Sequence, residues 1–192
     1  MLGSRVAIYN FGIHVAAYDA PEIEGFRLRE PLNFEAARCA AGFVARSGYD
    51  GEPGPPSWGK QVFPRFLSGS GHETGPSSLS LWEDIESLMA FSYGGVHAEA
   101  LRGARNWNLP QRWPPFVLWW VDPGHRPEWK EAVKRFEYLH DNGPSPYAFN
   151  FKQPFAANGD VAVIDRALVK QKAQINEAAQ RELLTRLKSL GV

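Results

Sequence analysis

The stretch Ser78–Ala104, SLSLWEDIESLMAFSYGGVHAEALRGA, holds the pattern that decides the fold. It opens with alternating apolar residues, which indicate a short strand, and after two acidic residues it changes to helical spacing. Gly94 and Gly95 interrupt the helical pattern, which resumes at once with Val96 and His97. Glycine inside a helix costs about 1 kcal/mol relative to alanine, so the pair indicates that a backbone, a ring or a ligand comes close. We therefore expect one wall of a small-molecule pocket beside His97.

Strand-like and helix-like segments alternate on both sides of this stretch. The central proline of Gln61–Leu67 limits that segment to an edge strand or a bulge, and Pro31 is expected to break or kink the first helix. The remaining patterns predict strands at Arg5–Ile13, Gly42–Tyr49, Leu79–Trp82, Trp113–Val121 and Tyr147–Phe151, and helices at Glu22–Ala41, Asp84–Arg105, Pro127–His140 and Ile164–Leu190.

This order of elements predicts an α+β fold with a ferredoxin-like βαββαβ core and an antiparallel sheet. Residues 1–160 would form this domain, and residues 161–192 a C-terminal helical extension. Trp113, Trp119 and Trp120 place rings on both faces of one strand. One face would be core, while the other suits a flat ligand or an oligomer interface. A homodimer joined through the sheet face, with two sheets forming one barrel, would cover it.

Composition narrows the function. The chain has 192 residues with 21 basic and 21 acidic side chains, so no net charge favours nucleic acid or a membrane surface, and we expect neither as a partner. The single Cys39 excludes an internal disulfide framework and fits a cytoplasmic setting. No apolar stretch has the length of a membrane span. The sequence also lacks dinucleotide, P-loop, zinc-protease and serine-hydrolase motifs, so we expect neither an organic cofactor nor a metal site.

Four segments carry a family resemblance: RVAIYNFGIHVAAYDAPE (5–22), GFVARSGYDGEPGPPSWGKQVFPRF (42–66), the opening stretch, and FVLWWVDPGHRPEWKEAVKRFEYLHDNGPSPYAFNF (116–151). Over about residues 5–155 the chain resembles a bacterial family of unknown function. That family is similar to the dimeric α/β-barrel superfamily, which holds antibiotic-biosynthesis and haem-degrading monooxygenases and muconolactone-isomerase-like proteins. The resemblance implies a ferredoxin-like core, dimerisation through the sheet and a pocket between sheet and helices. It does not imply one chemistry.

His97 is the strongest candidate for catalysis. In a continuous helix it would share a flank with Tyr93, four residues earlier. The functional interpretation is a general acid–base on the pocket wall. The alternative is a half-buried histidine bonded to a backbone carbonyl. The resemblance implies a further role, because haem-degrading relatives ligate iron through a histidine on the corresponding helix. It also implies that Asn10, on the first strand, orients substrate or oxygen.

Four residues are candidates for substrate binding. His14 follows the first strand, where a pocket mouth would lie, and Trp82 and Trp113 would stack on a flat ligand. Arg105, with Arg102 and Asn106, would grip a carboxylate or phenolate, although basic residues in a last helical turn need no function.

The sequence therefore predicts a homodimeric small-molecule enzyme of monooxygenase-like or isomerase–cyclase type. It would act on an apolar, aromatic or polycyclic substrate by proton transfer, without a tightly bound organic cofactor. The alternatives are a haem-binding or haem-dependent enzyme with His97 as axial ligand, and a metabolite-binding protein that is not an enzyme.

Overall fold

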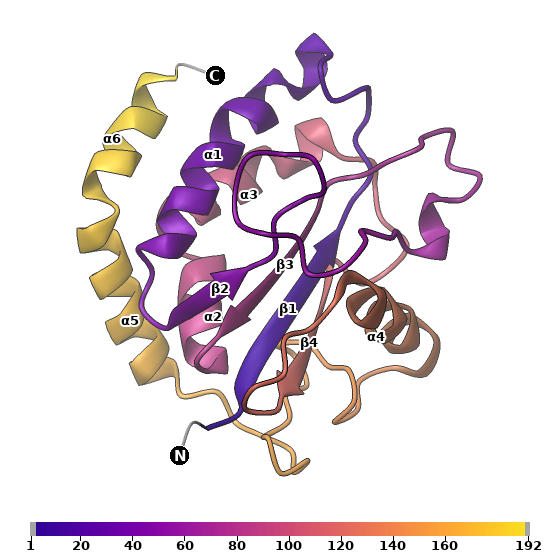
Figure 1. Ribbon diagram of the computed structural model, residues 1–192. Helices are drawn as coiled ribbons and strands as arrows, with labels where there is room; N and C mark the ends of the chain where they lie inside the picture. Colours follow the sequence, from indigo (N-terminus) through magenta and orange to yellow (C-terminus); the bar gives the residue numbers. More distant parts are fainter. Residues whose placement is uncertain (1–2, 191–192) are drawn as a thin grey trace. The chain divides into compact units, whose positions relative to one another are not determined.

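The computed structural model describes residues 3–190 (Figure 1). This part of the chain divides into two compact units, each assembled from separated segments. Among the described residues, unit 1 contains residues 3–13 together with Val44–Glu83 and Gln111–Val163. Unit 2 contains His14–Phe43, Asp84–Pro110 and residues 164–190. The sheet belongs to unit 1, whereas most of the helices belong to unit 2.

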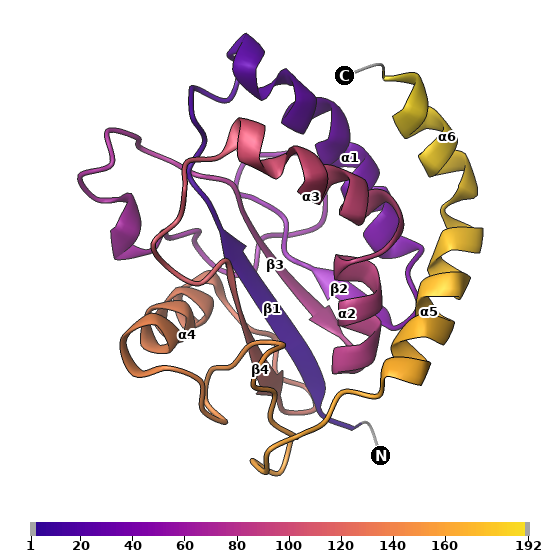
Figure 2. The same ribbon diagram turned by 180° about the vertical axis from the view of Figure 1, so that it is seen from behind.

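The sheet has four strands within residues 3–190: β1 (Arg5–Phe11), β2 (Phe43–Arg46), β3 (Ser77–Trp82) and β4 (Phe116–Val121), in the order β2-β3-β1-β4. The central strand β1 pairs antiparallel with β3 and with β4 (Figure 2). Tyr9 lies opposite Leu79 on one side and Val117 on the other, so these three side chains share a face. The predicted α+β class and antiparallel sheet are confirmed.

Helix α4 (Trp129–Asn142) packs on that face of the sheet. The ring of Tyr9 meets Trp129 edge-on at 6.1 Å and Phe136 at 5.3 Å. Arg135 lies over the Trp119 ring at 5.5 Å and donates to the carbonyl of Tyr147. The face that carries Tyr9 is therefore covered by a helix of the same unit. A partner sheet could reach it only if α4 moved away.

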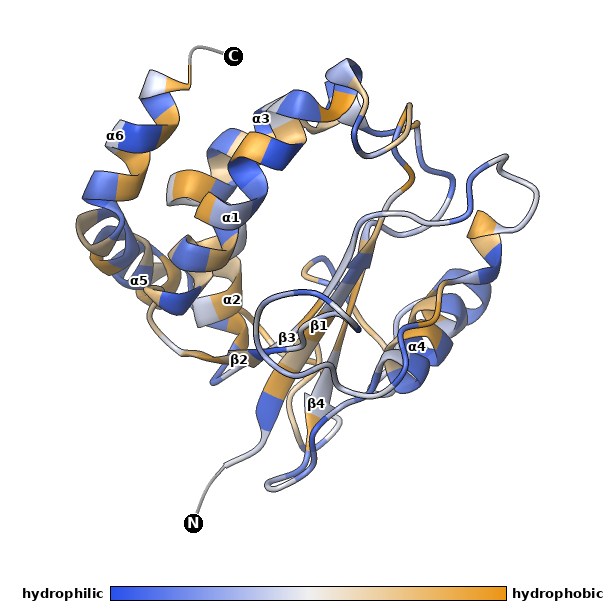
Figure 3. Ribbon diagram, turned by 45° about the horizontal axis from the view of Figure 1, so that its top comes forward, coloured by the Kyte–Doolittle hydropathy of each residue, from blue (hydrophilic) through white to orange (hydrophobic). Residues whose placement is uncertain are grey.

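Unit 2 consists of helices. They are η1 (Pro21–Ile23), α1 (Glu24–Arg38), α2 (Ile85–Ser92), α3 (Gly95–Trp107), α5 (Arg166–Ala179) and α6 (Arg181–Ser189). Of these, α1, α3 and α6 share an apolar cluster. Hydrophobic and hydrophilic residues alternate along α3 and α6, as an amphipathic helix requires (Figure 3). The apolar side chains meet in a cluster formed by Leu32, Ala36, Val96, Leu183 and Leu187.

Two buried amides fasten the C-terminal helices to the rest of unit 2. Gln180, at the junction of α5 and α6, accepts a hydrogen bond from the backbone N–H of Val96 (3.1 Å) and donates to the carbonyl of Ala36 (3.2 Å). Asn176 accepts from the N–H of Ala41 (2.8 Å). Each amide is only 1% exposed. These bonds satisfy backbone groups at the ends of α1 and α3 that have no partner inside their own helices.

Four sequence-based expectations differ from the structure, and two of them concern prolines. Helix α1 continues through Pro31, which is exposed and so keeps its ring in solvent, while Leu32 and Ala36 pack in the core. The predicted strand at Gln61–Leu67 is instead a coil that leads into the 3-10 turn η2 (Arg65–Leu67), because Pro64 caps the turn with a φ of −61°.

The segment Tyr147–Phe151 is not a full fifth strand. Only Phe149 pairs with β4, through two backbone hydrogen bonds with Leu118 of 2.8 and 2.9 Å. The long helix predicted over Ile164–Leu190 is interrupted at Gln180, where α5 ends and α6 begins.

Candidate functional site

The Gly94–Gly95 turn separates α2 from α3, as the sequence predicts. Gly95 has a φ of +53°, a conformation that L side chains rarely adopt, and a Cβ there would lie 2.1 Å from Oε1 of Gln180. A Cβ on Gly94 would lie 2.6 Å from the carbonyl oxygen of Ala90. The groups that come close are therefore a backbone carbonyl and a side chain of the protein itself.

His97 lies in the first turn of α3 and is half-buried. Its Nδ1 is 2.8 Å from the carbonyl oxygen of Ser92. A carbonyl only accepts, so Nδ1 carries the proton and the neutral ring keeps its lone pair on Nε2. Burial lowers the pKa of His97 below its ordinary 6.5, and the bond to Ser92 offsets this only in part. The ring also packs against Phe91, with 4.9 Å between centroids.

Tyr93 ends α2 on the other side of the glycine turn and is 58% exposed. Partial burial raises the pKa of its phenol, and the positive charge of Arg166 opposes that rise. The hydroxyl is therefore protonated at neutral pH. The helix is broken between Tyr93 and His97, so the spacing of a continuous helix does not apply to this pair.

The other two predicted residues of unit 2 lie toward the opposite end of α3. His14 is buried, with Nδ1 at 3.2 Å from the carbonyl oxygen of Trp107 and 3.1 Å from Oδ1 of Asn108. Arg105 is exposed in the last turn of α3. Ten residues of α-helix span roughly 15 Å, so these two residues are well separated from His97.

A groove of about 400 Å³ runs between α1 and α3 in unit 2. Trp107 forms its floor, and Gly25 and Gly103 make room for that ring, because a Cβ would lie 2.8 Å from the ring at Gly25 and 2.4 Å at Gly103. Arg29 lies over the same ring at 5.3 Å. The rim carries charges of both signs, from Glu22, Glu24, Arg29, Glu99 and Arg102, together with Asn106. Arg102 and Asn106 thus face a groove, whereas Arg105, His97 and Tyr93 are not among its lining residues.

Three predicted residues belong to unit 1. The side chain of Asn10 accepts from the backbone N–H of Ser78, its neighbour on β3, at 3.0 Å. Trp82 is buried and donates its indole N–H to Ser80 at 3.0 Å. Trp113 stacks on Phe66 with ring centroids 5.1 Å apart and the planes 3° from parallel.

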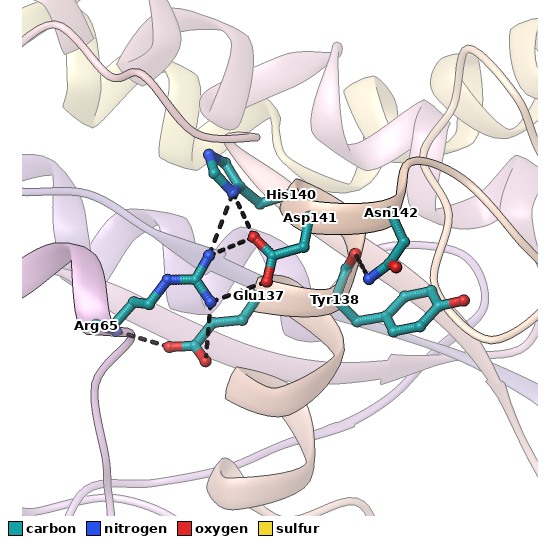
Figure 4. Close-up of polar contacts among 6 residues, drawn as sticks. All are labelled: Arg65, Glu137, Tyr138, His140, Asp141 and Asn142. Atoms are coloured by element: carbon teal, nitrogen blue, oxygen red, sulfur yellow. Dashed lines mark hydrogen bonds and ion pairs between the residues drawn. The ribbon is translucent and has the colours of Figure 1, made fainter.

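The sequence-based reasoning missed a cluster of charged residues on α4. Arg65, in η2, donates its backbone N–H to Glu137 (2.7 Å), and its guanidinium pairs with Asp141 (Figure 4). His140 donates to the same Asp141 carboxylate at 2.9 Å. Arg65 first, and then His140, lower the pKa of Asp141 to about 2. Glu137 and Asp141 are spaced by one helical turn, which is a signal for such a cluster. Their partner Arg65 lies 72 residues before Glu137 in the sequence, so the pairing itself is not apparent from the sequence.

Residues 3–190 contain no group of three or more histidine, cysteine or acidic side chains placed to hold a metal ion. Within the same residues, no helix has the length and apolar character needed to cross a membrane.

Comparison with protein families finds a match over residues 5–165 to a family described as a domain of unknown function, DUF3291. The chain belongs to this family. The expected membership in a family of unknown function is thus confirmed. No curated protein and no solved structure matches the chain. The family match covers the sheet, α1–α4 and Asp165, whereas α5 and α6 follow it.

Proposed function

We propose that this member of the DUF3291 family is a small-molecule enzyme of monooxygenase-like or isomerase–cyclase type. It acts on an apolar aromatic or polycyclic substrate by proton transfer and needs no tightly bound organic cofactor. His97 is the proton acceptor. The observation that supports this role is the hydrogen bond from Nδ1 of His97 to the carbonyl of Ser92.

This bond prepares the ring for base catalysis in two ways. It fixes the tautomer, so the lone pair is on Nε2, and it fixes the orientation of the ring, so little reorganisation is needed during proton transfer. The lowered pKa keeps the ring neutral at pH 7. Tyr93, protonated and exposed beyond the glycine turn, is the proposed donor to a substrate oxygen.

The His97→Asn variant tests this role directly. An asparagine amide also donates to the Ser92 carbonyl, but it has no basic nitrogen. We expect the variant to fold like the wild type and to lose turnover by at least a hundredfold on any polycyclic phenol that the wild type consumes. His125→Asn, at an exposed histidine of unit 1 that has no role in the proposed site, is the matched control and should keep most of the activity. Unchanged turnover by His97→Asn would refute the proposed role.

A haem-binding protein with His97 as axial ligand is the second candidate. The observation that favours it is the same one, because ligating histidines generally donate their other N–H to a carbonyl or a carboxylate. Haemin titration separates the two candidates. A shift of the Soret band of haemin that occurs with the wild type and not with His97→Asn supports ligation by His97. An unshifted Soret band in the presence of the wild type excludes haem binding. A pocket that binds metabolites without converting them is the remaining alternative. It predicts ligand binding that His97→Asn leaves unchanged.

We further propose that the sheet is a ferredoxin-like core that associates as a homodimer. The strand order β2-β3-β1-β4, with β1 antiparallel to both neighbours, supports such a core. Because α4 covers the face that carries Tyr9, the dimer would use another surface of the sheet. Light scattering coupled to size exclusion should give twice the 21.5 kDa chain mass. A monomer at micromolar concentration would argue against this assembly.

A further inference from the structure

The hydroxyl of Tyr9 is one of several buried polar side-chain atoms of unit 1 that lack a hydrogen-bond partner among the described residues. Tyr9 is 0% exposed, and its ring is held edge-on by Trp129 and Phe136. Among the described residues, none meets both the distance and the angle of a hydrogen bond to this hydroxyl, although the Ser77 hydroxyl is close enough to lower its pKa. Buried hydroxyls nearly always have a partner, because leaving one unpaired away from water is costly. This hydroxyl is therefore placed to bind an additional molecule.

The polar neighbours of Tyr9 are already engaged with one another. Tyr49 donates its hydroxyl to the carbonyl of Ser77 (2.7 Å), and Gln61 donates to the hydroxyl of the same serine (3.1 Å). Burial raises the pKa of Tyr9, the nearby Ser77 hydroxyl offsets this in part, and the charge of Glu137 reinforces it. Tyr9 thus remains a neutral phenol with a proton to donate, beside a carboxylate that would repel an anion.

The surroundings of this hydroxyl are aromatic. Phe136 contacts Phe11, at 6.3 Å, and Phe66, at 6.0 Å, in addition to Tyr9. Trp113 completes the group by stacking on Phe66 and contacting Phe11 at 5.9 Å. The indole N–H of Trp113 is the second buried donor here for which the described residues provide no acceptor. Flat rings and unpaired donors are the groups that recognise a planar molecule with an acceptor oxygen.

One loop segment, here called the strap (residues 61–75), closes over this aromatic layer. Phe66 contributes its ring from the strap, and Arg65 fastens the strap to α4 through Glu137 and Asp141 (Figure 4). These ion pairs are largely exposed, with the Arg65 side chain 46% accessible, so they hold the strap only weakly. Gly69 and Gly71, with φ of +75° and +83°, give the tip of the strap left-handed turns that suit a hinge.

We propose that the aromatic layer beneath the strap is a binding site for a small, planar, uncharged molecule with an acceptor oxygen, such as an aryl ketone, whose oxygen accepts the hydrogen bond of Tyr9. The strap admits the ligand when the contacts of Arg65 release. This site contains neither His97 nor Tyr93, so the proposal does not depend on the enzymatic role assigned to them.

The test uses acetophenone as the uncharged probe and benzoate, of similar size, as the charged one. Titrations followed by tryptophan fluorescence should show that the full chain binds acetophenone at least tenfold more tightly than benzoate. Tyr9→Phe should weaken acetophenone binding by at least tenfold. Tyr138→Phe, at an exposed tyrosine of helix α4, is the matched control and should bind like the wild type. Absent binding of acetophenone, or equal binding by Tyr9→Phe, would overturn the proposal.

Thermal unfolding of the ligand-free variants distinguishes a loss of ligand binding from a loss of fold stability. If the hydroxyl is unpaired without ligand, Tyr9→Phe melts at or above the wild-type temperature. A variant that melts well below it would mean that the hydroxyl is bonded within the fold, and the site would be rejected. For the strap, Arg65→Ala should speed association several-fold in stopped-flow measurements, while Arg126→Ala, an exposed arginine of unit 1, should not. Equal rates would refute the gating role.

Discussion

Unit 1 and unit 2 are stabilised by different kinds of contact. In unit 1, α4 is held on the sheet by rings that meet edge-on or stacked, centred on Phe136 and Trp129. In unit 2, aliphatic side chains form an apolar cluster, and the buried amides of Asn176 and Gln180 bind the ends of neighbouring helices. The first kind of contact tolerates variation in geometry, whereas the second requires a particular donor or acceptor at hydrogen-bonding distance.

The difference shows which information a sequence displays. A stretch rich in aromatic residues predicts a bulky core, but it does not show which rings contact one another. An amide such as Gln180 is indistinguishable from a surface glutamine, because its partners Val96 and Ala36 are 84 and 144 residues away. The specificity of unit 2 therefore depends on residues whose importance only the fold reveals.

The largest expected effect is the loss of the central ring of unit 1. Phe136→Ala removes a fully buried side chain that contacts three other rings, so we expect a loss of about 4 kcal/mol in the free energy of unfolding. Urea unfolding followed by tryptophan fluorescence measures it. Tyr138→Ala, on the exposed side of α4, should cost much less. Equal losses in the two variants would contradict the assigned packing.

Removing the amide of unit 2 should have the next largest effect. Gln180→Ala leaves the N–H of Val96 and the carbonyl of Ala36 without a side-chain partner in the core, which we expect to cost about 2–3 kcal/mol. The control is Gln174→Ala, an exposed glutamine on α5. If helix content and unfolding midpoint are the same for both variants, the amide does not have the role described here.

A smaller effect is expected at the start of α2. Asp84 caps the helix through the N–H of Ser87 (2.7 Å) and pairs with Lys172 (2.8 Å), which also contacts the Ser87 hydroxyl. Asp84→Asn keeps a good capping residue but loses the charge, so we expect a loss of about 1–2 kcal/mol at pH 7.

The pH dependence of that variant identifies the cause. Burial alone would raise the pKa of Asp84, but the hydrogen bonds from Lys172 and Ser87 outweigh it and hold the pKa below 3.8. A depressed carboxyl pKa stabilises the fold above that value and ceases to do so as the carboxylate is protonated in more acidic solution. The difference between wild type and Asp84→Asn should therefore shrink below pH 3.8. A difference that stays constant into acid would exclude the charge pair as its source.

The smallest effect concerns His97. Its folded pKa lies below 6.5, so the unfolded chain binds more protons between the two values, and stability should fall as pH is lowered through this window. Lowering the pH from 7 to 5 should therefore destabilise the wild type more than His97→Asn. Chemical denaturation at several pH values, with the imidazole titrated by NMR, checks this. An imidazole pKa above 6.5 would contradict it.

Much of the fold is predictable because it depends on local spacing. The strand around Tyr9, the break at Gly94–Gly95 and helix α4 follow from alternation, helix-breaking residues and apolar periodicity. The continuation of helix α1 through Pro31 is not predictable, because the free-energy cost of a proline inside a helix is offset by packing on the opposite side of α1. The break between α5 and α6 at Gln180 is likewise not predictable from the sequence, because glutamine is a good helix former. Its side chain instead makes hydrogen bonds to the ends of other helices.

The candidate site was predictable only in part. The sequence singled out His97 and also named the alternative of a bond to a backbone carbonyl, which the structure shows. The sequence did not single out Tyr9, because an alternating Ala7, Tyr9, Phe11 reads as ordinary core. Its distinction is an unpaired hydroxyl, a property of the surroundings and not of the residue type.

The position of the C-terminal helices has a practical consequence. The family match ends at residue 165, but the groups that α5 and α6 satisfy lie within it: the N–H groups of Val96 and Ala41 and the carbonyl of Ala36. A recombinant fragment cut at the family boundary would expose Val96 and its apolar neighbours to water and leave these groups without their partners. Such a fragment would aggregate or be degraded, so any truncation study of this protein needs to retain the chain at least as far as Ser189.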